Sequence, residues 1–167
     1  MRKYFQKLRL LRAITTVMLM LVASFSWAEI TPTEPANGDG SADAPYQIST
    51  ADELAWFADA VNGGKGTINA KLIADIDYSE CNKMIGTSFI NSFQGTFDGN
   101  GKKVKLNINV SADYAGLFAY TYGAQIENVI VEGSITSTAR YVGGIVGYAA
   151  VATTMEQLKD ITIIQVR

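Results

Sequence analysis

The sequence predicts an all-β domain of the solenoid type, which a leader segment, a linker and one helix precede. Apolar and polar residues alternate with a period of two after residue 68, as they do in strands with one buried face. Near the C-terminus a block of residues also recurs, and recurring short β-units are typical of solenoids. The 167 residues, 48% of them hydrophobic, suffice for one domain with one core.

The leader, residues 1–28, has the composition of a signal peptide. It contains five basic residues and no acidic one, and its second half is uncharged. Small residues, Ser26 and Ala28, stand at the −3 and −1 positions of a cleavage site, so cleavage is expected between Ala28 and Glu29. We favour a cleaved signal over a permanent anchor, because the uncharged run is shorter than the roughly 20 residues that span a bilayer. The protein is therefore expected to be secreted or on the cell surface, with no stable membrane span.

Composition excludes several classes of function. Beyond residue 28 the chain holds 9 basic and 16 acidic residues, a balance that disfavours nucleic acid and anionic membranes as partners. The single cysteine, Cys81, excludes a disulfide framework, and it is expected to be a small buried apolar residue or a free thiol. The absence of histidine removes His-ligated zinc and His-activated nucleophiles. No metal or cofactor is expected. For Asp39 and Asp43 we favour turn formation over calcium binding.

A linker and a helix are expected to open the exported chain. Residues 29–44 are polar and proline-containing, which is typical of a tether. Thr50 and Glu53 then form a capping-box pattern, and apolar residues follow at helical spacing on one face. The glycines after Asn62 favour a stop. The spacing predicts a helix over 51–62 that shields the first turn of a solenoid domain spanning 45–167.

Strands are expected next. The alternation predicts one strand over 71–78 and a second over 103–110, with the valine, leucine and isoleucine side chains of the latter facing inward. Between them, the Asp-Gly and Asn-Gly steps within 95–101 predict a tight turn.

The repeat has two parts. Gly116–Tyr120 matches Gly144–Tyr148 at a spacing of 28 residues, and Gln125–Val131 matches Gln157–Ile163 at a spacing of 32. Stacked copies bury an apolar column that one copy cannot cover alone, so matched residues are expected to lie one above the other.

The residues from Gly116 to Gly147 resemble the GLUG motif of bacterial surface proteins, with a decayed second copy to 163. The segments 45–64, 70–77 and 93–101 are similar to the leader that precedes such repeats in secreted adhesin-like proteins. The resemblance implies a right-handed parallel β-helix with repeats over 116–163, on an exported protein. It implies no catalysis by the repeats.

Five tyrosines are the candidate ligand contacts. Tyr120 and Tyr148 occupy matched repeat positions, and three more tyrosines lie nearby in the sequence, so the candidate strip is Tyr114, Tyr120, Tyr122, Tyr141 and Tyr148. Such rings can contact sugars or a protein partner. They can equally form a half-buried ladder whose role is packing.

An acid pair offers the enzymatic alternative. Asp75 and Asp77 lie two residues apart and so project from one strand face. Paired carboxylates serve glycosidases, provided that one acid has a raised pKa, but solvated surface acids are the favoured interpretation. A polysaccharide lyase would want a basic side chain beside its base, and beyond residue 28 the arginines are Arg140 and Arg167 alone.

These observations predict a non-catalytic exported module for adhesion or binding on a bacterial cell surface, with a glycan or a surface protein as partner. A carbohydrate-active enzyme and a purely structural spacer are the alternatives. The uncapped apolar run 161–166 favours a chain that is part of a longer protein or that associates end-on through this strand.

Overall fold

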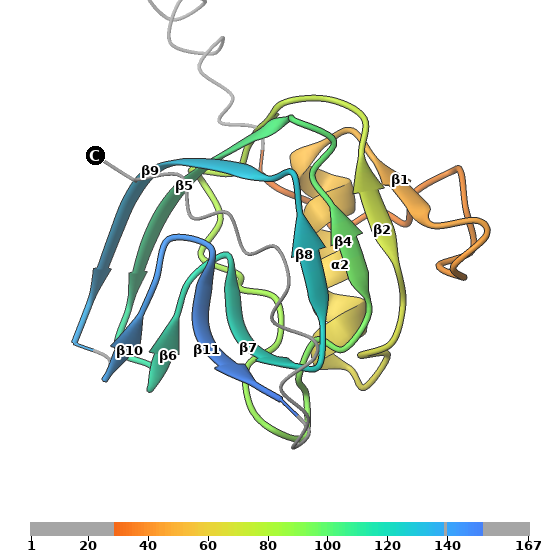
Figure 1. Ribbon diagram of the computed structural model, residues 1–167. Helices are drawn as coiled ribbons and strands as arrows, with labels where there is room; N and C mark the ends of the chain where they lie inside the picture. The colour runs from red at the N-terminus through yellow and green to blue at the C-terminus, as the bar shows by residue number, and fades with distance from the viewer. Residues whose placement is uncertain (1–28, 139, 152–167) are drawn as a thin grey trace, which may run out of the picture.

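A computed structural model describes residues 29–138 and 140–151, which contain one helix and a series of short strands (Figure 1). In chain order the elements are β1 (Tyr46–Ile48), α2 (Ala51–Asn62), β2 (Ala70–Leu72), β3 (Ile76–Asp77), β4 (Thr96–Asp98), β5 (Lys103–Val110), β6 (Tyr114–Ala115), β7 (Phe118–Tyr122), β8 (Gln125–Glu127), β9 (Ile130–Ser137), β10 (Tyr141–Val142) and β11 (Val146–Ala150).

The strands form four separate parallel sheets. Sheet A has the order β1-β2-β4-β8, and sheet B has the order β3-β5-β9. Two further sheets contain two strands each, β6 with β10 and β7 with β11. Every named strand pair is parallel, and its partners lie 24 to 29 residues apart in the chain.

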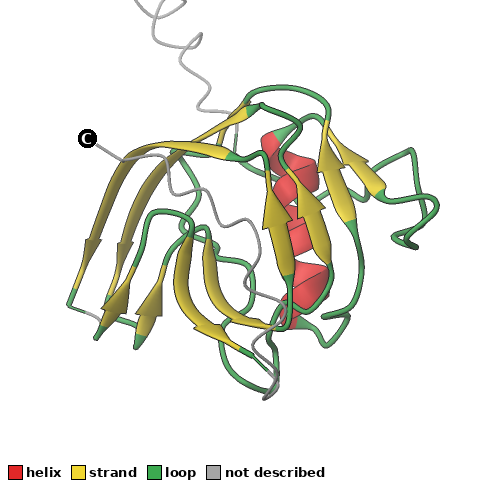
Figure 2. Ribbon diagram, viewed as in Figure 1, coloured by secondary structure: helices red, strands yellow, loops and turns green. Residues whose placement is uncertain are grey.

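The expectation of a single right-handed parallel β-helix over 45–167 is wrong. The described residues form no closed solenoid, because the four sheets have unequal numbers of strands and no coil of strands repeats throughout. After β1 the chain enters α2, so a helix stands where a solenoid would need strands (Figure 2). Between β3 and β4 the chain contributes only the isolated bridges of Ile85 and Phe93. The fold is instead a mixed one, of short parallel sheets with one helix.

The predicted helix is confirmed, and its ends follow from local chemistry. The Thr50 hydroxyl accepts a hydrogen bond from the Glu53 amide at 3.2 Å, and the Glu53 carboxylate accepts one from the Thr50 amide at 3.1 Å. The buried face holds Leu54, Ala55, Phe57, Ala58 and Val61. The left-handed residue beyond the helix is Gly64, with φ of +101°, rather than Gly63.

The two strand predictions have different outcomes. β5 spans the predicted residues, and Val104, Leu106 and Ile108 are buried while their neighbours are exposed. The predicted strand 71–78 is wrong in its extent, because β2 ends at Leu72 and β3 begins at Ile76, in a different sheet. The predicted turn after β4 is confirmed by the positive φ angles of Asn100 and Gly101.

The first part of the repeat is confirmed as a strand pair. β7 and β11 lie side by side, with Phe118 opposite Val146 and Tyr120 opposite Tyr148. The matched segment 157–163, the run 161–166 and the leader 1–28 with Ala28 lie outside the described residues. Within the described ranges, no helix has the length and apolarity that a membrane crossing requires.

Part of the expected linker contacts the domain. The Thr31 amide donates to the Asp52 carboxylate at 2.7 Å, and the Thr33 amide donates to the Asp52 carbonyl at 3.1 Å. The Asp39 carboxylate accepts from the Ser41 amide at 2.9 Å, which is the turn chemistry expected there. This segment is therefore joined to the first turn of α2.

Aromatic side chains join the helix to the sheets. The Phe57 ring of α2 lies 5.8 Å from that of Phe93 and 5.9 Å from that of Phe97 in β4. Both of these rings lie 5.1 Å from the ring of Phe118 in β7. All four side chains are fully buried, so one apolar core connects α2, sheet A and the strand that carries Tyr120.

Candidate binding surface

Two parallel strand pairs bring four of the predicted tyrosines together. β6 and β10 place Tyr114 opposite Tyr141, and β7 and β11 place Tyr120 opposite Tyr148. The parallel pairing therefore makes neighbours of rings that are 27 and 28 residues apart in the chain.

The four rings, here called the tyrosine cluster, contact one another across both strand pairs. Tyr114 and Tyr141 are stacked, with centroids 5.5 Å apart and planes at 18°. Tyr120 and Tyr148 lie 5.0 Å apart. Between the pairs, Tyr114 meets Tyr120 edge-on at 5.1 Å, and Tyr141 meets Tyr148 at 5.1 Å. These separations lie within the favourable range for aromatic pairs.

Phe89 extends the cluster and was missed by the sequence analysis. Its ring lies edge-on to Tyr122 at 5.6 Å and to Tyr120 at 6.4 Å, so Phe89 connects the fifth predicted tyrosine to the others. Phe89 is 63% exposed and the adjacent Ile90 is 85% exposed. The available signal was the occurrence of two large apolar residues side by side in the polar loop between Gly86 and Ser92. The tyrosine cluster, Tyr122 and Phe89 together are called the aromatic surface below.

Burial divides the aromatic surface into a packed part and an accessible part. Tyr120 is 8% exposed, so its ring serves packing, as the ladder alternative predicts. Tyr141, in contrast, is 38% exposed, and Phe89 is more exposed still. The outer rings thus present accessible area on a base of buried rings, an arrangement that limits the entropy lost when a ligand binds.

The aromatic surface is electrically neutral at physiological pH. Burial raises the pKa of Tyr120 above its usual value, and the neighbouring hydroxyl of Tyr148 raises it further. The hydroxyl of Tyr120 therefore stays protonated and can both donate and accept a hydrogen bond. Beside the rings, in the chain, stand one exposed acid and one exposed base, Asp113 and Arg140.

The acid pair is engaged in contacts that hold neighbouring strands. The Asp75 carboxylate accepts from the Lys103 amide at 2.9 Å. The Asp77 carboxylate accepts from Ser79 and from the Lys105 ammonium, at 2.9 Å for the latter. The hydrogen bonds from the Ser79 side chain, followed by that from Lys105, lower the pKa of Asp77 to about 2. A general acid in a glycosidase needs the opposite shift, so Asp77 lacks the property that this role requires.

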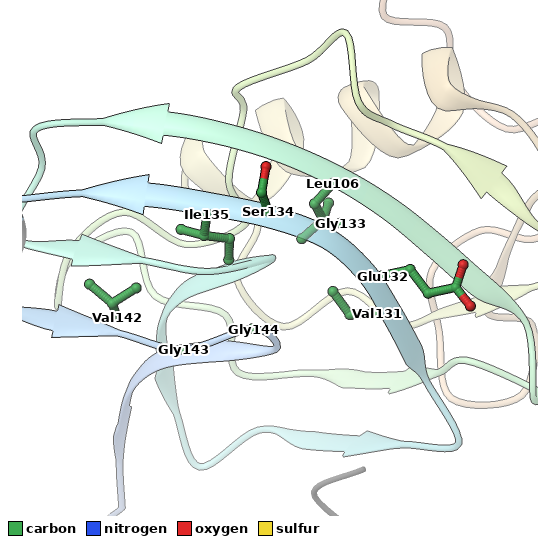
Figure 3. Close-up of a pocket in the computed structure, with 9 residues that line it drawn as sticks. All are labelled: Leu106, Val131, Glu132, Gly133, Ser134, Ile135, Val142, Gly143 and Gly144. Atoms are coloured by element: carbon green, nitrogen blue, oxygen red, sulfur yellow. The ribbon is translucent and has the colours of Figure 1, made fainter. Parts of the chain in front are cut away.

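Two further features bear on chemistry. Cys81 is a free thiol whose side chain is buried, 8% exposed, and it lies in the apolar core. A pocket of about 210 Å³ lies between β9 and the segment joining β10 to β11 (Figure 3). Its lining is mainly apolar or glycine: Leu106, Val131, Glu132, Gly133, Ser134, Ile135, Val142, Gly143 and Gly144. The carboxylate of Glu132 is paired with Lys103 at 2.7 Å.

Across residues 29–138 and 140–151, no three Cys, Asp or Glu side chains gather in a way that could hold a metal ion. Comparisons of the chain with protein-family models, with curated proteins and with solved structures find no match. The aromatic surface therefore carries the functional argument.

Proposed function

We propose that this protein is an exported, non-catalytic binding module of a bacterial cell surface, and that it contacts its ligand through the aromatic surface. The observation that carries the proposal is the association of five tyrosines and Phe89 on neighbouring strands and a loop, with Tyr141 and Phe89 accessible to solvent. The composition of residues 1–28 supports export, and the resemblance to the GLUG motif supports a role in adhesion.

A neutral glycan fits this surface best. Aromatic rings pack against the apolar faces of sugar rings, and tyrosine hydroxyls exchange hydrogen bonds with sugar hydroxyls. Beyond residue 28 the chain carries seven more acidic than basic side chains, so long-range repulsion disfavours acidic polysaccharides. A host or bacterial surface protein is the other class of ligand to screen.

The test is a binding screen of the full chain against immobilised neutral glycans and surface proteins. For a ligand found in this way, Tyr141→Ala and Phe89→Ala should each weaken binding by about 2- to 10-fold, which corresponds to the roughly 0.5–1.5 kcal/mol of an aromatic contact. Ile73→Ala is the matched control, because Ile73 is a 42% exposed apolar side chain outside the aromatic surface. Binding that neither aromatic substitution changes would contradict the proposal.

The alternatives give different results in the same laboratory format. A carbohydrate-active enzyme would cleave a polysaccharide, and cleavage that Asp75→Asn abolishes would replace the binding proposal with the enzymatic one. A structural spacer would bind nothing in the screen, and Tyr120→Ala and Tyr148→Ala would lower only the free energy of unfolding.

A further inference from the structure

Sheets A and B each end in a strand whose outer edge has no partner among the described residues. β8 is the last strand of sheet A and β9 is the last strand of sheet B (Figure 1). An eight-residue strand such as β9 therefore leaves a row of backbone hydrogen-bonding groups available on its outer side.

The apolar interior is also incompletely covered at this end. In β4 and β5 the inward side chains Phe97, Val104 and Ile108 are at most 1% exposed. Their partners in β8 and β9, which are Ile126, Val131 and Ile135, are only partly buried. The pocket of about 210 Å³ opens among these same residues, where the side chains of Leu106, Val131 and Ile135 approach Val142 (Figure 3). One more layer of apolar side chains is needed to bury them as their partners are buried.

We propose that residues 157–163, which lie outside the described residues, dock on β8 and β9 as the next parallel strands and cover this end of the core. The repeat supplies the alignment. Gln157–Ile163 matches Gln125–Val131, so the inward positions Ile126, Val129 and Val131 would be covered by the apolar residues Leu158, Ile161 and Ile163. The first part of the same repeat already pairs in parallel, as β7 with β11.

Charge on the outer face supports the same register. Lys71, Asp98 and Glu127 lie opposite one another on successive strands of sheet A, and the Lys71 ammonium pairs with the Asp98 carboxylate at 3.0 Å. Glu127 thus stands beside another acid, and its carboxylate accepts only from the Gln125 amide at 3.2 Å among the described residues. The alignment places Lys159 opposite Glu127, where an opposite charge stabilises a cross-strand pair.

The corner between the two sheets gives a third indication. Asn128 joins β8 to β9 with a φ of +53°, a conformation that Asn and Asp adopt more readily than other residues with a side chain. The residue aligned with Asn128 is Asp160. The aligned segment thus has an inward apolar residue, an outward countercharge and a suitable corner residue at the positions where β8 and β9 need them.

Disulfide trapping in the full chain tests this register. Glu127→Cys and Lys159→Cys are introduced together, with Cys81→Ala in every variant to remove the native thiol. Adjacent strands lie about 4.7–4.9 Å apart, within the Cα separations that a disulfide bridges. Mild oxidation should give an intrachain disulfide in most of the protein, detected by mass spectrometry after digestion and by a monomeric band on a non-reducing gel.

Two matched variants calibrate the result. Lys71→Cys with Asp98→Cys places thiols at a register pair that the structure shows, so its intrachain yield is the positive control and also demonstrates a folded chain. Lys105→Cys with Lys159→Cys places one thiol on exposed Lys105 of β5, which already has strands on both sides, and it should give little disulfide.

An intrachain yield for the 127/159 pair that is no higher than that of the 105/159 pair would overturn the proposal. So would a 127/159 disulfide found mainly between two chains, because the open edge would then belong to end-on association with a second copy. Neither outcome affects the proposed ligand surface, since the tyrosine cluster lies in the other two sheets.

Discussion

At the scale of single residues, polar side chains fasten each strand to the one before it. The Asn69 carbonyl oxygen accepts from the Thr96 amide at 2.8 Å, and the Asn82 carbonyl oxygen accepts from the Asn109 amide at 2.9 Å. The Asn100 side chain donates to the Leu72 carbonyl at 3.1 Å. These contacts satisfy backbone groups where the short strands begin and end, which regular pairing leaves without a partner.

Asp77 belongs to this set, and its contacts make stability depend on pH. Because its pKa falls from 3.8 to about 2 on folding, the carboxylate stabilises the folded state above pH 3.8, and this contribution is lost as the pH falls toward 2. Asp77→Asn should therefore lower the free energy of unfolding at pH 6, and the difference from the natural chain should shrink between pH 4 and 2. Urea titrations across this range measure it.

Glu80→Gln is the control, since it removes one exposed carboxylate from the same loop. An Asp77→Asn deficit that is the same at pH 6 and pH 2 would show that the charge of Asp77 contributes nothing to stability.

At the scale of elements, the sequence predicted those whose signals are local. The capping box of Thr50 and Glu53 and the spacing of Leu54 and Phe57 specify α2 without reference to the rest of the chain. β5 was equally predictable because eight alternating residues face one core. The division of 71–78 into β2 and β3 was not, since the residues at the corner, 73–75, continue the same alternation.

Gly133 in β9 has a requirement that alternation does not reveal. Its φ is +113°, and a Cβ at this position would lie 1.9 Å from the Leu106 carbonyl oxygen of β5. Gly133→Ala should therefore lower the free energy of unfolding by more than the roughly 1–3 kcal/mol of an unfavourable backbone conformation alone, because the two strands must also separate. Chemical denaturation provides the measurement.

Gly101→Ala separates the two effects. Gly101 also has a positive φ, of +69°, but a Cβ there would meet nothing within 4 Å. Equal losses for the two substitutions would mean that the close approach of β9 to β5 is not what requires glycine at 133.

At the scale of the whole molecule, the fold class could not be predicted from periodicity. Alternation identifies strands, and the repeat identified which strands pair, as Tyr120 and Tyr148 show. Neither pattern specifies how many strands each sheet collects, and this number distinguishes four short sheets from one continuous coil. The tyrosine cluster followed from the repeat, whereas Phe89 reaches it through a loop that has no periodicity.

The aromatic core predicts that the molecule unfolds as one unit. Phe57→Ala removes the ring that joins α2 to Phe93 and Phe97, and it should cost about 3–5 kcal/mol of stability. Trp56 fluorescence reports on the helix and far-UV circular dichroism reports on the entire chain, so both should shift to the same lower urea midpoint.

Phe89→Ala is the matched aromatic control, because an exposed ring contributes little to stability and its loss should change the free energy of unfolding by about 0.5 kcal/mol or less. Separate midpoints for the two probes in the natural chain would show that the helix and the sheets unfold independently.

The composition of the tyrosine cluster has a consequence for regulation by occupancy. Its rings come in equal numbers from two stretches of chain, around Tyr114–Tyr120 and Tyr141–Tyr148, so detaching the later stretch removes half of them. A molecule held by rings of both stretches acts as a clamp across the junction, and mass action then transfers its binding free energy to the attachment of the later stretch. Grip on a target and resistance of the protein to being pulled apart would rise together.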